Sequence, residues 1–385
     1  MGKKVVYAKN LVLENHMLKD FAVVFSDKVL EIIPKSEAIS QSLDSVGEFE
    51  YVLPGFIDVH IHGSAGADVM DASLESLETI SRAITKSGTT SFLPTTMTMA
   101  EDKICLALEN IREAKRVQDE TGETKGARIL GAHLEGPFIS VHYKGAQDPQ
   151  HIQKPNDRWL KNYYDIVKLI TMAAEEDDNF AMIKEWSSRG IVVSLGHTNA
   201  DYETALLAYD AGARHITHLF NAMTPIHHRK PGMVTAALNK DFNVEMITDG
   251  FHIRPEVINL VSRAKSKDQI ILITDCMRAG FMGDGESELG GQKVYVKGDQ
   301  CLLESGTIAG SIHRMDKALR NVLDFTECTL IEVSKMLSLN PARDLGIDSE
   351  YGSIEVGKFA DFVCMDLGLE VNKTIVSGQT MYEVE

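Results

Sequence analysis

The sequence predicts an α/β protein, a parallel (β/α)8 TIM barrel with a small discontinuous β-sandwich domain formed by both chain ends. Three observations lead to this fold. Short apolar runs alternate with helix-length amphipathic segments from about residue 55 to residue 345, as in parallel barrels. Short, alternating, β-branched segments stand at both ends of the chain. Polar residues able to bind metals or move protons follow several of the apolar runs.

The chain ends are predicted to share one small domain. Residues 4–13 and 21–33 have the period-two pattern of antiparallel strands. Segments of the same kind near the C-terminus are 353–355, 362–366 and 373–376. Because the termini of a domain often lie close together, we predict that 1–53 and 349–385 form a single β domain around a barrel of residues 54–348.

The central part contains eight apolar runs that we interpret as the barrel strands. These runs are 56–61, 90–94, 129–134, 191–195, 214–218, 244–248, 270–274 and 306–310. Helical patterns intervene at 73–87, 100–118, 177–189, 201–211, 254–266 and 314–325. A doubly wound open sheet is the alternative, but no early run is followed by the GxGxxG phosphate fingerprint of such folds.

Composition narrows the function. The chain of 385 residues has 25% charged residues and a formal net charge of −17, which favours neither nucleic acid nor an anionic membrane as partner. No apolar run approaches the roughly 20 residues that span a bilayer, and no signal peptide is visible. The five cysteines are scattered and form no CxxC motif, which is typical of reduced thiols. We therefore expect a cytoplasmic protein.

His60 and His62 end the first apolar run. Side chains at i and i+2 of an extended strand point the same way, so the two imidazoles can hold one metal ion. With 13 histidines in the chain, one such pair also arises easily by chance. The pair therefore needs support from other parts of the sequence.

That support comes from the ends of the later runs. Glu135 follows the third run, and His197 and His218 follow the fourth and fifth. Asp275 ends the seventh run, and Asp249 and His252 follow the sixth. Because active sites of barrels lie at the carboxyl ends of the strands, these groups are expected to converge. Imidazole and carboxylate ligands without thiolate suit a catalytic Zn²⁺, Fe²⁺, Mn²⁺ or Co²⁺ rather than a structural zinc.

Three other histidines are predicted to be hydrogen-bonded core residues, namely His133, His151 and His215.

Several segments together resemble the amidohydrolase superfamily, and within it the deacetylases of phosphorylated amino sugars. The segments are 54–63 (PGFIDVHIHG), 133–138 (HLEGPF), 196–198 (GHT), 218–223 (HLFNAM), 249–252 (DGFH), 274–275 (TD), 309–311 (AGS) and 352–361 (GSIEVGKFAD). The resemblance covers essentially the whole chain. It implies metal-dependent removal of an acetyl group in amino-sugar catabolism and cell-wall recycling.

The resemblance also implies a set of metal ligands. Glu135, His197 and His218 match the main ligands of the superfamily deacetylases. His60 and His62 match the ligands of a second ion that some members have, so one or two ions per chain are expected.

Further positions match the groups that handle the substrate. Asp275 matches the catalytic carboxylate, and His252 matches a substrate-contacting histidine. Asn221 and Ala222 match the segment whose backbone holds the sugar phosphate. Arg229 matches a phosphate-binding arginine that reaches over from the neighbouring subunit of a homodimer. His228 lies beside Arg229 in a cationic cluster and is a second candidate for that pocket.

The chain departs from the family at Gln147. Many members have a histidine there that orients the acetyl carbonyl, whereas glutamine donates a hydrogen bond but carries no charge. His142 lies five residues earlier and could replace that histidine if the loop bends. Cys276, where a small residue is usual, is interpreted as a packing substitution.

The predicted chemistry is hydrolysis of an amide by activated water, with Asp275 as general base and then general acid. One rival is a cyclic amidase of the dihydroorotase or hydantoinase kind, whose bridging lysine lies on strand 4. The run counted here as strand 4, 191–197, contains no lysine, and Glu135 can bridge instead. A hydrolase of another N-acetylated compound remains open. A metal-free scaffold is the rival from a different class, and it predicts lost ligands.

Overall fold

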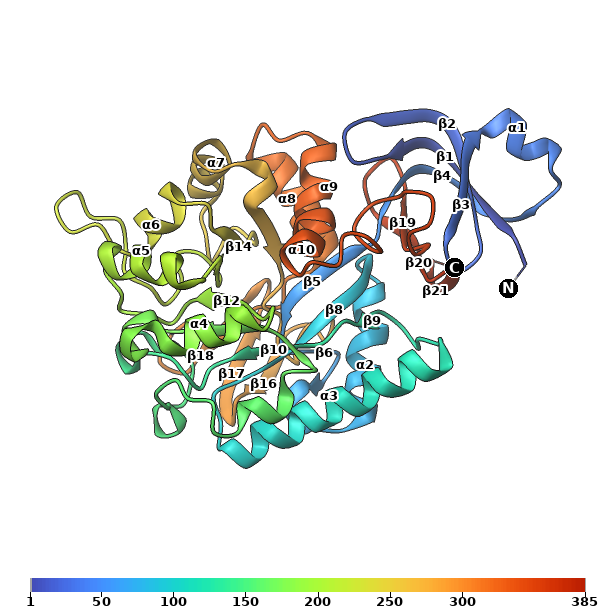
Figure 1. The fold of residues 1–385 in the computed structure, drawn as a ribbon. Helices are drawn as coiled ribbons and strands as arrows, with labels where there is room; N and C mark the ends of the chain where they lie inside the picture. Colours follow the sequence, from blue (N-terminus) through green and yellow to red (C-terminus); the bar gives the residue numbers. More distant parts are fainter. Residues whose placement is uncertain (1, 385) are drawn as a thin grey trace.

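A computed structural model describes residues 2–384, and it contains the predicted parallel barrel (Figure 1). Eight strands pair in parallel, each with the next along the chain. They are β5 (Phe56–Ile61), β8 (Thr89–Thr96), β10 (Ala132–Glu135), β11 (Val167–Met172), β12 (Val192–Leu195), β13 (His215–Ile216), β14 (Asn243–Ile247) and β15 (Ile270–Ile273). The short strand β9 (Arg128–Ile129) pairs with β8.

The barrel closes between its first and last strands at the carboxyl end. The N–H of Asp275 donates to the carbonyl of His60, and the N–H of His62 donates to the carbonyl of Cys276, both at 2.8 Å. Closure therefore brings two predicted site histidines directly beside the predicted catalytic aspartate.

One predicted strand is wrong, and one real strand was not predicted. Within residues 306–310 only Ile308 forms an isolated bridge, with Leu302, and the segment does not belong to the barrel sheet. The true fourth strand is β11, whose sequence VKLITM is interrupted by Lys168 and follows a long irregular segment. The barrel still has eight strands, but the run predicted as the fourth strand is the fifth, and each later predicted strand up to β15 is likewise one position further along.

Strand 4 does contain a lysine, contrary to the expectation drawn from the run 191–197. Lys168 is the second residue of β11, whereas Thr171 is the residue paired with Glu135. Three residues of strand separate the two positions by about 10 Å. Lys168 therefore lies toward the opposite end of the barrel from Glu135.

The six predicted helices are present. They are α2 (Leu74–Thr85), α3 (Glu101–Thr121), α4 (Ala181–Ser188), α5 (Tyr202–Ala211), α7 (Pro255–Ala264) and α8 (Met315–Phe325). Ser73 and Asp201 cap α2 and α5 by accepting backbone N–H groups of the first turn. Further helices that were not predicted are α1 (Lys35–Ser40), α6 (Met233–Asn239), α9 (Leu330–Leu337) and α10 (Leu339–Asp344).

The end of the barrel away from the site is filled by apolar side chains. Ile57, Leu93, Leu169 and Ile271 are buried there in one cluster together with Ala342 of α10. Full burial of each such aliphatic side chain contributes about 1.5–3 kcal/mol. This packing stabilises the barrel beneath the rim where the site lies.

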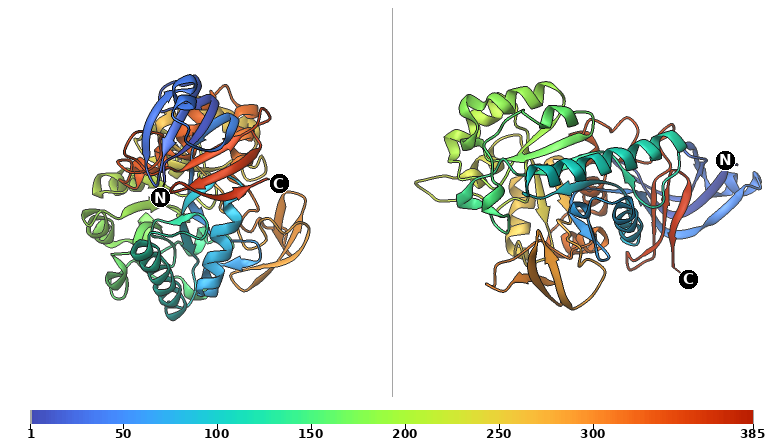
Figure 2. Two further views of the ribbon diagram at one scale, coloured as in Figure 1. Left: turned by 90° about the vertical axis from the view of Figure 1, so that its right-hand side faces the viewer. Right: turned by 90° about the horizontal axis from the view of Figure 1, so that it is seen from below.

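Both chain ends form one seven-stranded sheet, as Figure 2 shows from two further sides. Its strands are β1 (Lys4–Val12), β2 (Met17–Phe25), β3 (Val29–Pro34), β4 (Asp44–Pro54), β19 (Phe362–Met365), β20 (Val371–Val376) and β21 (Gln379–Glu383). The spatial order is β21-β20-β19-β4-β1-β2-β3. Phe25 is on β2 and Phe362 on β19, and two strands, β4 and β1, lie between them in the sheet. Their rings are nevertheless 5.2 Å apart, so the sheet curls around one core, as predicted for the small domain. The exact domain boundaries stay a prediction.

A three-stranded antiparallel sheet after β15 was not predicted. It consists of β16 (Gly285–Leu289), β17 (Gln292–Lys297) and β18 (Gln300–Leu303), and a short hairpin, β6 (Gly63–Ser64) with β7 (Ala67–Asp68), follows β5. Gln292 donates from Nε2 to the carbonyl of Ala146 at 2.6 Å, which ties this sheet to the loop that follows β10.

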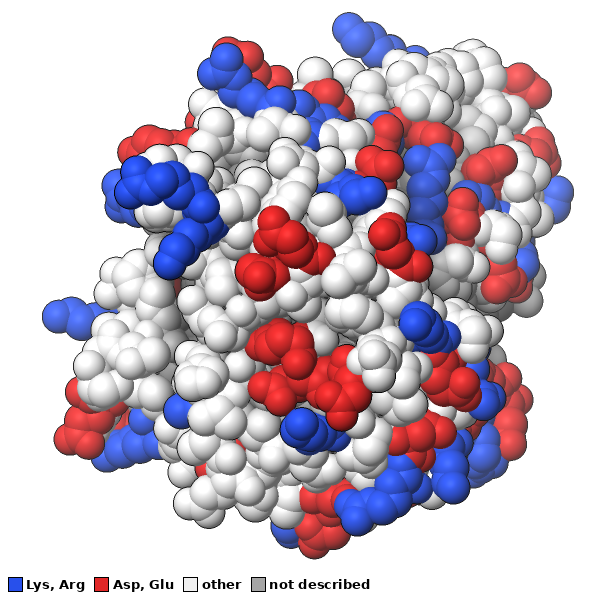
Figure 3. Space-filling view, turned by 60° about the vertical axis from the view of Figure 1, so that its left-hand side comes forward, with Lys and Arg blue, Asp and Glu red and all other residues white. Residues whose placement is uncertain are grey.

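Among residues 2–384, no helix has the length and apolar character needed to cross a membrane. Basic and acidic side chains are interspersed on the face drawn in Figure 3.

Candidate metal centre and active site

A cavity of about 430 Å³ lies where the strands end, and it gathers most of the predicted site residues. Nine of them line it: His62, Glu135, Gln147, His197, His218, Asn221, Ala222, His252 and Asp275. Leu289 of the three-stranded sheet and Ile308 complete part of its wall. The expected convergence at the carboxyl ends of the strands is therefore what the structure shows.

One triad of side chains consists of Glu135, His197 and His218. The Nε2 atoms of both histidines lie 3.1 Å from Oε1 of Glu135 and 3.1 Å from each other. All three side chains are at most 7% exposed. Three potential ligand atoms thus meet at one point inside the barrel mouth.

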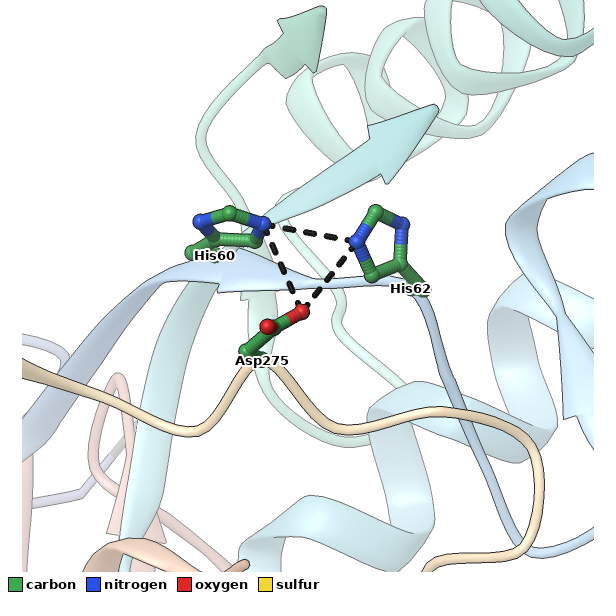
Figure 4. A group of neighbouring side chains, drawn as sticks. All are labelled: His60, His62 and Asp275. Carbon is green, nitrogen blue, oxygen red and sulfur yellow. Dashed lines mark hydrogen bonds and ion pairs between the residues drawn. The ribbon is translucent and has the colours of Figure 1, made fainter. Parts of the chain in front are cut away.

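A second triad consists of His60, His62 and Asp275, whose side chains point toward a common centre (Figure 4). The two Nε2 atoms lie 3.3 Å apart, and Oδ1 of Asp275 lies 3.5 Å from His60 and 3.3 Å from His62. Oε2 of Glu135 is 3.3 Å from Nε2 of His62. Glu135 therefore stands between the two triads, because its Oε1 is also 3.5 Å from Nε2 of His60.

The orientation of the imidazoles fits a metal ion. Three of the four histidines use Nδ1 to contact an acceptor outside the cluster, which leaves Nε2 free to face inward. The acceptors are Thr95 O for His62 at 3.2 Å, Tyr143 O for His197 at 2.9 Å and Glu245 Oε2 for His60 at 2.9 Å. Four nitrogen donors and two carboxylates without thiolate match the ligands of a catalytic divalent metal.

The backbone is strained at three of these residues. His197, His218 and Asp275 have φ values of 47°, 29° and 49°, which side-chain-bearing residues adopt rarely. Each such conformation costs on the order of 1 kcal/mol and persists where the surroundings hold it. Strain at these three residues is what we expect of a site built for function rather than for stability.

The charges of the two triads are tightly coupled. Burial alone would raise the pKa of Glu135, but the charge of His60 and hydrogen bonds from His197 and His218 hold it well below its usual range. Burial opposes protonation of His60, yet Glu245, Asp275 and Glu135 raise its pKa to about 9. Protons and a metal cation therefore compete for the same carboxylate-rich cavity.

Gln147 is held at both ends of its carboxamide. Its Oε1 accepts the N–H of Thr98 at 2.8 Å, and its Nε2 donates to Oε2 of Glu135 at 2.7 Å. One N–H of Nε2 remains for the cavity that Gln147 lines. His142 also lines this cavity, so the loop does bend toward the site.

The groups predicted to contact substrate occupy another part of the cavity. Nδ1 of His252 lies 2.6 Å from Oδ2 of Asp249, which leaves Nε2 for a ligand. The N–H of Asn221 already donates to the carbonyl of His218 at 3.0 Å, so Asn221 does not supply the backbone donor expected of it. Ala222, in a left-handed conformation with φ of 50°, lines the cavity beside it.

His228 and Arg229 lie apart from the cavity of their own chain. They belong to an exposed stretch, residues 225–230, in the loop before α6 (Figure 1). The N–H of Arg229 donates to Nδ1 of His227 at 3.3 Å, which shapes the turn. The side chains of this stretch are not among those lining the cavity.

The predictions for core histidines are partly confirmed. His133 and His215 are fully buried, and both ring nitrogens of each have hydrogen-bond partners. The prediction for His151 is wrong, because its side chain is 36% exposed at the end of a short 3-10 helix next to Asp148. Cys276 is buried, and burial raises the pKa of its thiol, as a packing role requires.

Sequence reasoning missed Glu245, which contacts His60 from within β14. Its signal was a single carboxylate inside the apolar run 244–248, where an unpaired charge would be very costly.

Glu175 was also missed. Its carboxylate accepts the hydroxyl of Thr198 and the N–H of Asn199, both at 2.5 Å, and thereby fixes the loop after His197.

Comparison with known proteins agrees with this geometry. A model of the Amidohydrolase family matches residues 51–381. The N-acetylglucosamine-6-phosphate deacetylase of Bacillus subtilis (strain 168) is 41% identical over 97% of this chain and 95% of its own. The N-acetylgalactosamine-6-phosphate deacetylase of Escherichia coli O157:H7 is 36% identical over 97% and 98%. A crystal structure of N-acetylglucosamine-6-phosphate deacetylase from Pasteurella multocida superposes with a TM-score of 0.92 at 31% identity, covering 98% and 99%. Relatives of this kind match the chain over nearly its whole length, and its barrel has two groups of potential metal ligands at the mouth. The chain therefore belongs to the amidohydrolase family.

Proposed function

We propose that this protein hydrolyses the acetamido group of N-acetylglucosamine 6-phosphate to give glucosamine 6-phosphate and acetate. The observation that carries the proposal is the convergence of the Glu135–His197–His218 triad, the His60–His62 pair and Asp275 on one cavity. A relative of that name, 41% identical over 97% of the chain, supports the choice of substrate.

Metal binding is assigned to the two triads. Glu135, His197 and His218 would hold one divalent ion, and His60 and His62 would hold a second, with Zn²⁺, Fe²⁺, Mn²⁺ and Co²⁺ as the candidates. A bound ion of this kind lowers the pKa of a coordinated water to about 7. Glu135 contacts histidines of both triads, so it would contribute a carboxylate ligand to either ion.

Asp275 is assigned the proton transfers. Its carboxylate lies at the rim beside both histidines of the second triad, and its side chain is 12% exposed, so it reaches the cavity. Burial raises its pKa, but the charge of His60 and a hydrogen bond from His62 bring it below the usual range, which keeps Asp275 ionised and able to accept a proton. Asp275 takes a proton from the attacking water and delivers it to the nitrogen that leaves as the amine.

The acetyl oxygen needs a hydrogen-bond donor as negative charge develops on it. Gln147 has one free N–H after its contact with Glu135, and His252 has Nε2 free after its contact with Asp249. We assign Gln147 to the acetyl oxygen and His252 to the substrate farther from the metal. Asp249 fixes the ring orientation of His252.

The phosphate is assigned to a composite pocket. Ala222 supplies a backbone donor and Asn221 shapes the turn, while Arg229 and His228 come from the neighbouring subunit of a homodimer. An arginine that is exposed and outside the cavity of its own chain supports this arrangement. A C2 dimer is the simplest assembly that gives each site one such arginine.

The five free thiols support a location in the cytoplasm.

A second candidate substrate is N-acetylgalactosamine 6-phosphate. A relative named N-acetylgalactosamine-6-phosphate deacetylase is 36% identical over 97% of the chain. A relative named N-acetylglucosamine-6-phosphate deacetylase has a similar identity, 40% over 88% of the chain. The two substrates differ only in the configuration at one ring hydroxyl, so the same metal centre and phosphate pocket serve both.

The test is a comparison of kcat/KM for acetate release. We expect N-acetylglucosamine 6-phosphate to give the highest value, followed by its galacto epimer and, far below, by unphosphorylated N-acetylglucosamine. A higher value for the epimer would transfer the assignment to the second candidate. Equal values with and without phosphate would refute the phosphate pocket.

A further inference from the structure

Glu245 of β14 is a buried carboxylate at the centre of the hydrogen bonds beneath the two triads. Its side chain is 0% exposed. Oε2 accepts from Nδ1 of His60 at 2.9 Å and from the backbone N–H of His218 at 3.0 Å, and Oε1 accepts from Nε2 of His215 at 3.0 Å. Three donors, one from β5 and two from β13 and the residues just after it, therefore meet one side chain.

The contacts continue to the opposite end of the barrel. Nδ1 of His215 lies 2.7 Å from Oδ2 of Asp344 in α10, and Asn243 donates to the other oxygen of Asp344 at 2.5 Å. His215 thus lies between two carboxylates and uses both ring nitrogens as donors. This arrangement balances the negative charge of Glu245 in a region without access to water.

The position of Glu245 has consequences for both triads. Because Oε2 accepts the hydrogen on Nδ1, Nε2 is the ring nitrogen of His60 that is left to exchange its proton for a metal ion, and it faces His62 and Asp275. The same oxygen holds the backbone of His218, a residue of the other triad with a strained φ of 29°. One carboxylate oxygen therefore orients a member of each triad.

We propose that Glu245 is a positioning residue that sets the geometry of both metal subsites at once, by fixing the ring of His60 and the backbone of His218 through a single oxygen. The inference rests on the metal centre assigned above. His215 and Asp344 hold Glu245 in this place from below. Loss of a contact of this kind typically weakens metal binding 10–100-fold.

The substitution Glu245→Gln tests the proposal with little change of volume. An amide places a donor at one of the two oxygen positions, so it faces either the donors on His60 and His218 or the donor on His215. Asp316→Asn is the matched control. Asp316 is also a buried carboxylate, 1% exposed, and its bonds go to Arg314 and Arg320. Both substitutions remove one buried charge, but only the first faces the metal centre.

Two measurements decide the outcome without any turnover of substrate. Dissociation constants for Co²⁺ are obtained by competition with a chelator, and the visible absorption of the Co²⁺-loaded protein reports on its ligands. We expect Glu245→Gln to weaken binding of Co²⁺ about 10–100-fold and to change the absorption bands. Asp316→Asn is expected to lower the melting temperature, to leave the dissociation constant for Co²⁺ within about twofold of wild type and to leave the absorption bands unshifted.

Wild-type affinity and spectrum in both the Glu245→Gln and the Glu245→Asp proteins would overturn the proposal, because the shorter aspartate cannot keep the contacts in either orientation. Equal losses in Glu245→Gln and Asp316→Asn would also overturn it, since that result describes a structural carboxylate only. If the Gln substitution prevents folding, Glu245→Asp takes its place, because the shorter side chain cannot reach His60 and His215 together and the same loss is expected. These readouts are independent of the substrate, so failure of the proposed deacetylation leaves them interpretable.

Discussion

The Nε2 atoms of His197 and His218 lie 3.1 Å apart, and each is 3.1 Å from the same oxygen of Glu135. A single proton cannot satisfy three such atoms at once, whereas a cation placed among them contacts all three. This relationship is the structural basis for the metal-dependent activity that we assign, and it leads to the following predictions.

Replacement of Glu135 by glutamine removes the charged side chain that contacts both triads. We expect the purified Glu135→Gln protein to contain less than one metal ion per chain and to lose at least about 100-fold in kcat/KM, more than the loss of an indirect contact causes. Elemental analysis and acetate release check this. Full metal content together with normal activity would show that Glu135 is not a ligand.

Replacement of Gln147 by leucine leaves Oε2 of Glu135 and the N–H of Thr98 without their partner. We expect metal affinity to fall about 10–100-fold. Gln118→Leu is the control, because Gln118 is also buried and its carboxamide bonds at both ends to the backbone of Ile129, which does not line the cavity. A similar loss in both variants would assign the effect to general destabilisation.

Asp275→Asn preserves shape but removes the proton acceptor. We expect kcat for acetate release to fall about 10²–10⁴-fold, with one metal still bound at the Glu135–His197–His218 triad. Isothermal titration with substrate should still show binding. A kcat within threefold of wild type would exclude Asp275 as the general base.

The placement of Arg229 across an interface can be tested by mixing two inactive proteins. Arg229→Gln lacks the proposed phosphate contact and Asp275→Asn lacks the proposed base, so each variant alone is expected to have low activity. In a mixed dimer, one site carries both substitutions and the other carries neither, and activity should return after subunit exchange. Mixtures that remain at the sum of the separate activities would place Arg229 in the site of its own chain or outside any site.

The pH dependence of stability follows from His215. Burial lowers the pKa of this imidazole, but Asp344 and then Glu245 raise it to about 10 from an unfolded value of 6.5. The protonated form is favoured by folding, so its contribution is complete below pH 6.5 and is lost as the pH rises toward 10. Urea unfolding of the metal-free protein should show a larger loss of unfolding free energy between pH 6.5 and 9.5 in wild type than in His215→Asn. Equal losses would contradict the charged state of His215.

The sequence predicted the barrel and most of its site because both depend on local patterns. Apolar runs followed by polar residues mark strand ends, and side chains at strand ends must converge once the barrel closes. This reasoning located His60, His62, Glu135, His197, His218 and Asp275 correctly at one mouth. It failed at β11, where Lys168 interrupts a short strand, and at 306–310, where an apolar segment packs without joining the sheet.

The rest depends on long-range contacts that no local pattern contains. Glu245 contacts His60 across 185 positions of the chain, and His215 contacts Asp344 across 129. The N–H of Asn221 looks available in the sequence, but the turn after His218 uses it. Such pairings follow from the register of neighbouring strands, which becomes known only in the folded structure.

Acetate release from N-acetylglucosamine 6-phosphate, measured before and after removal of metal, tests the central claim most directly. The protein stripped by a chelator is expected to be inactive and to recover on addition of Zn²⁺, Fe²⁺, Mn²⁺ or Co²⁺. The recovered enzyme should prefer the phosphorylated sugar by at least about 100-fold, the value of one or two charged hydrogen bonds. Undiminished acetate release from protein shown to contain no metal would contradict the account.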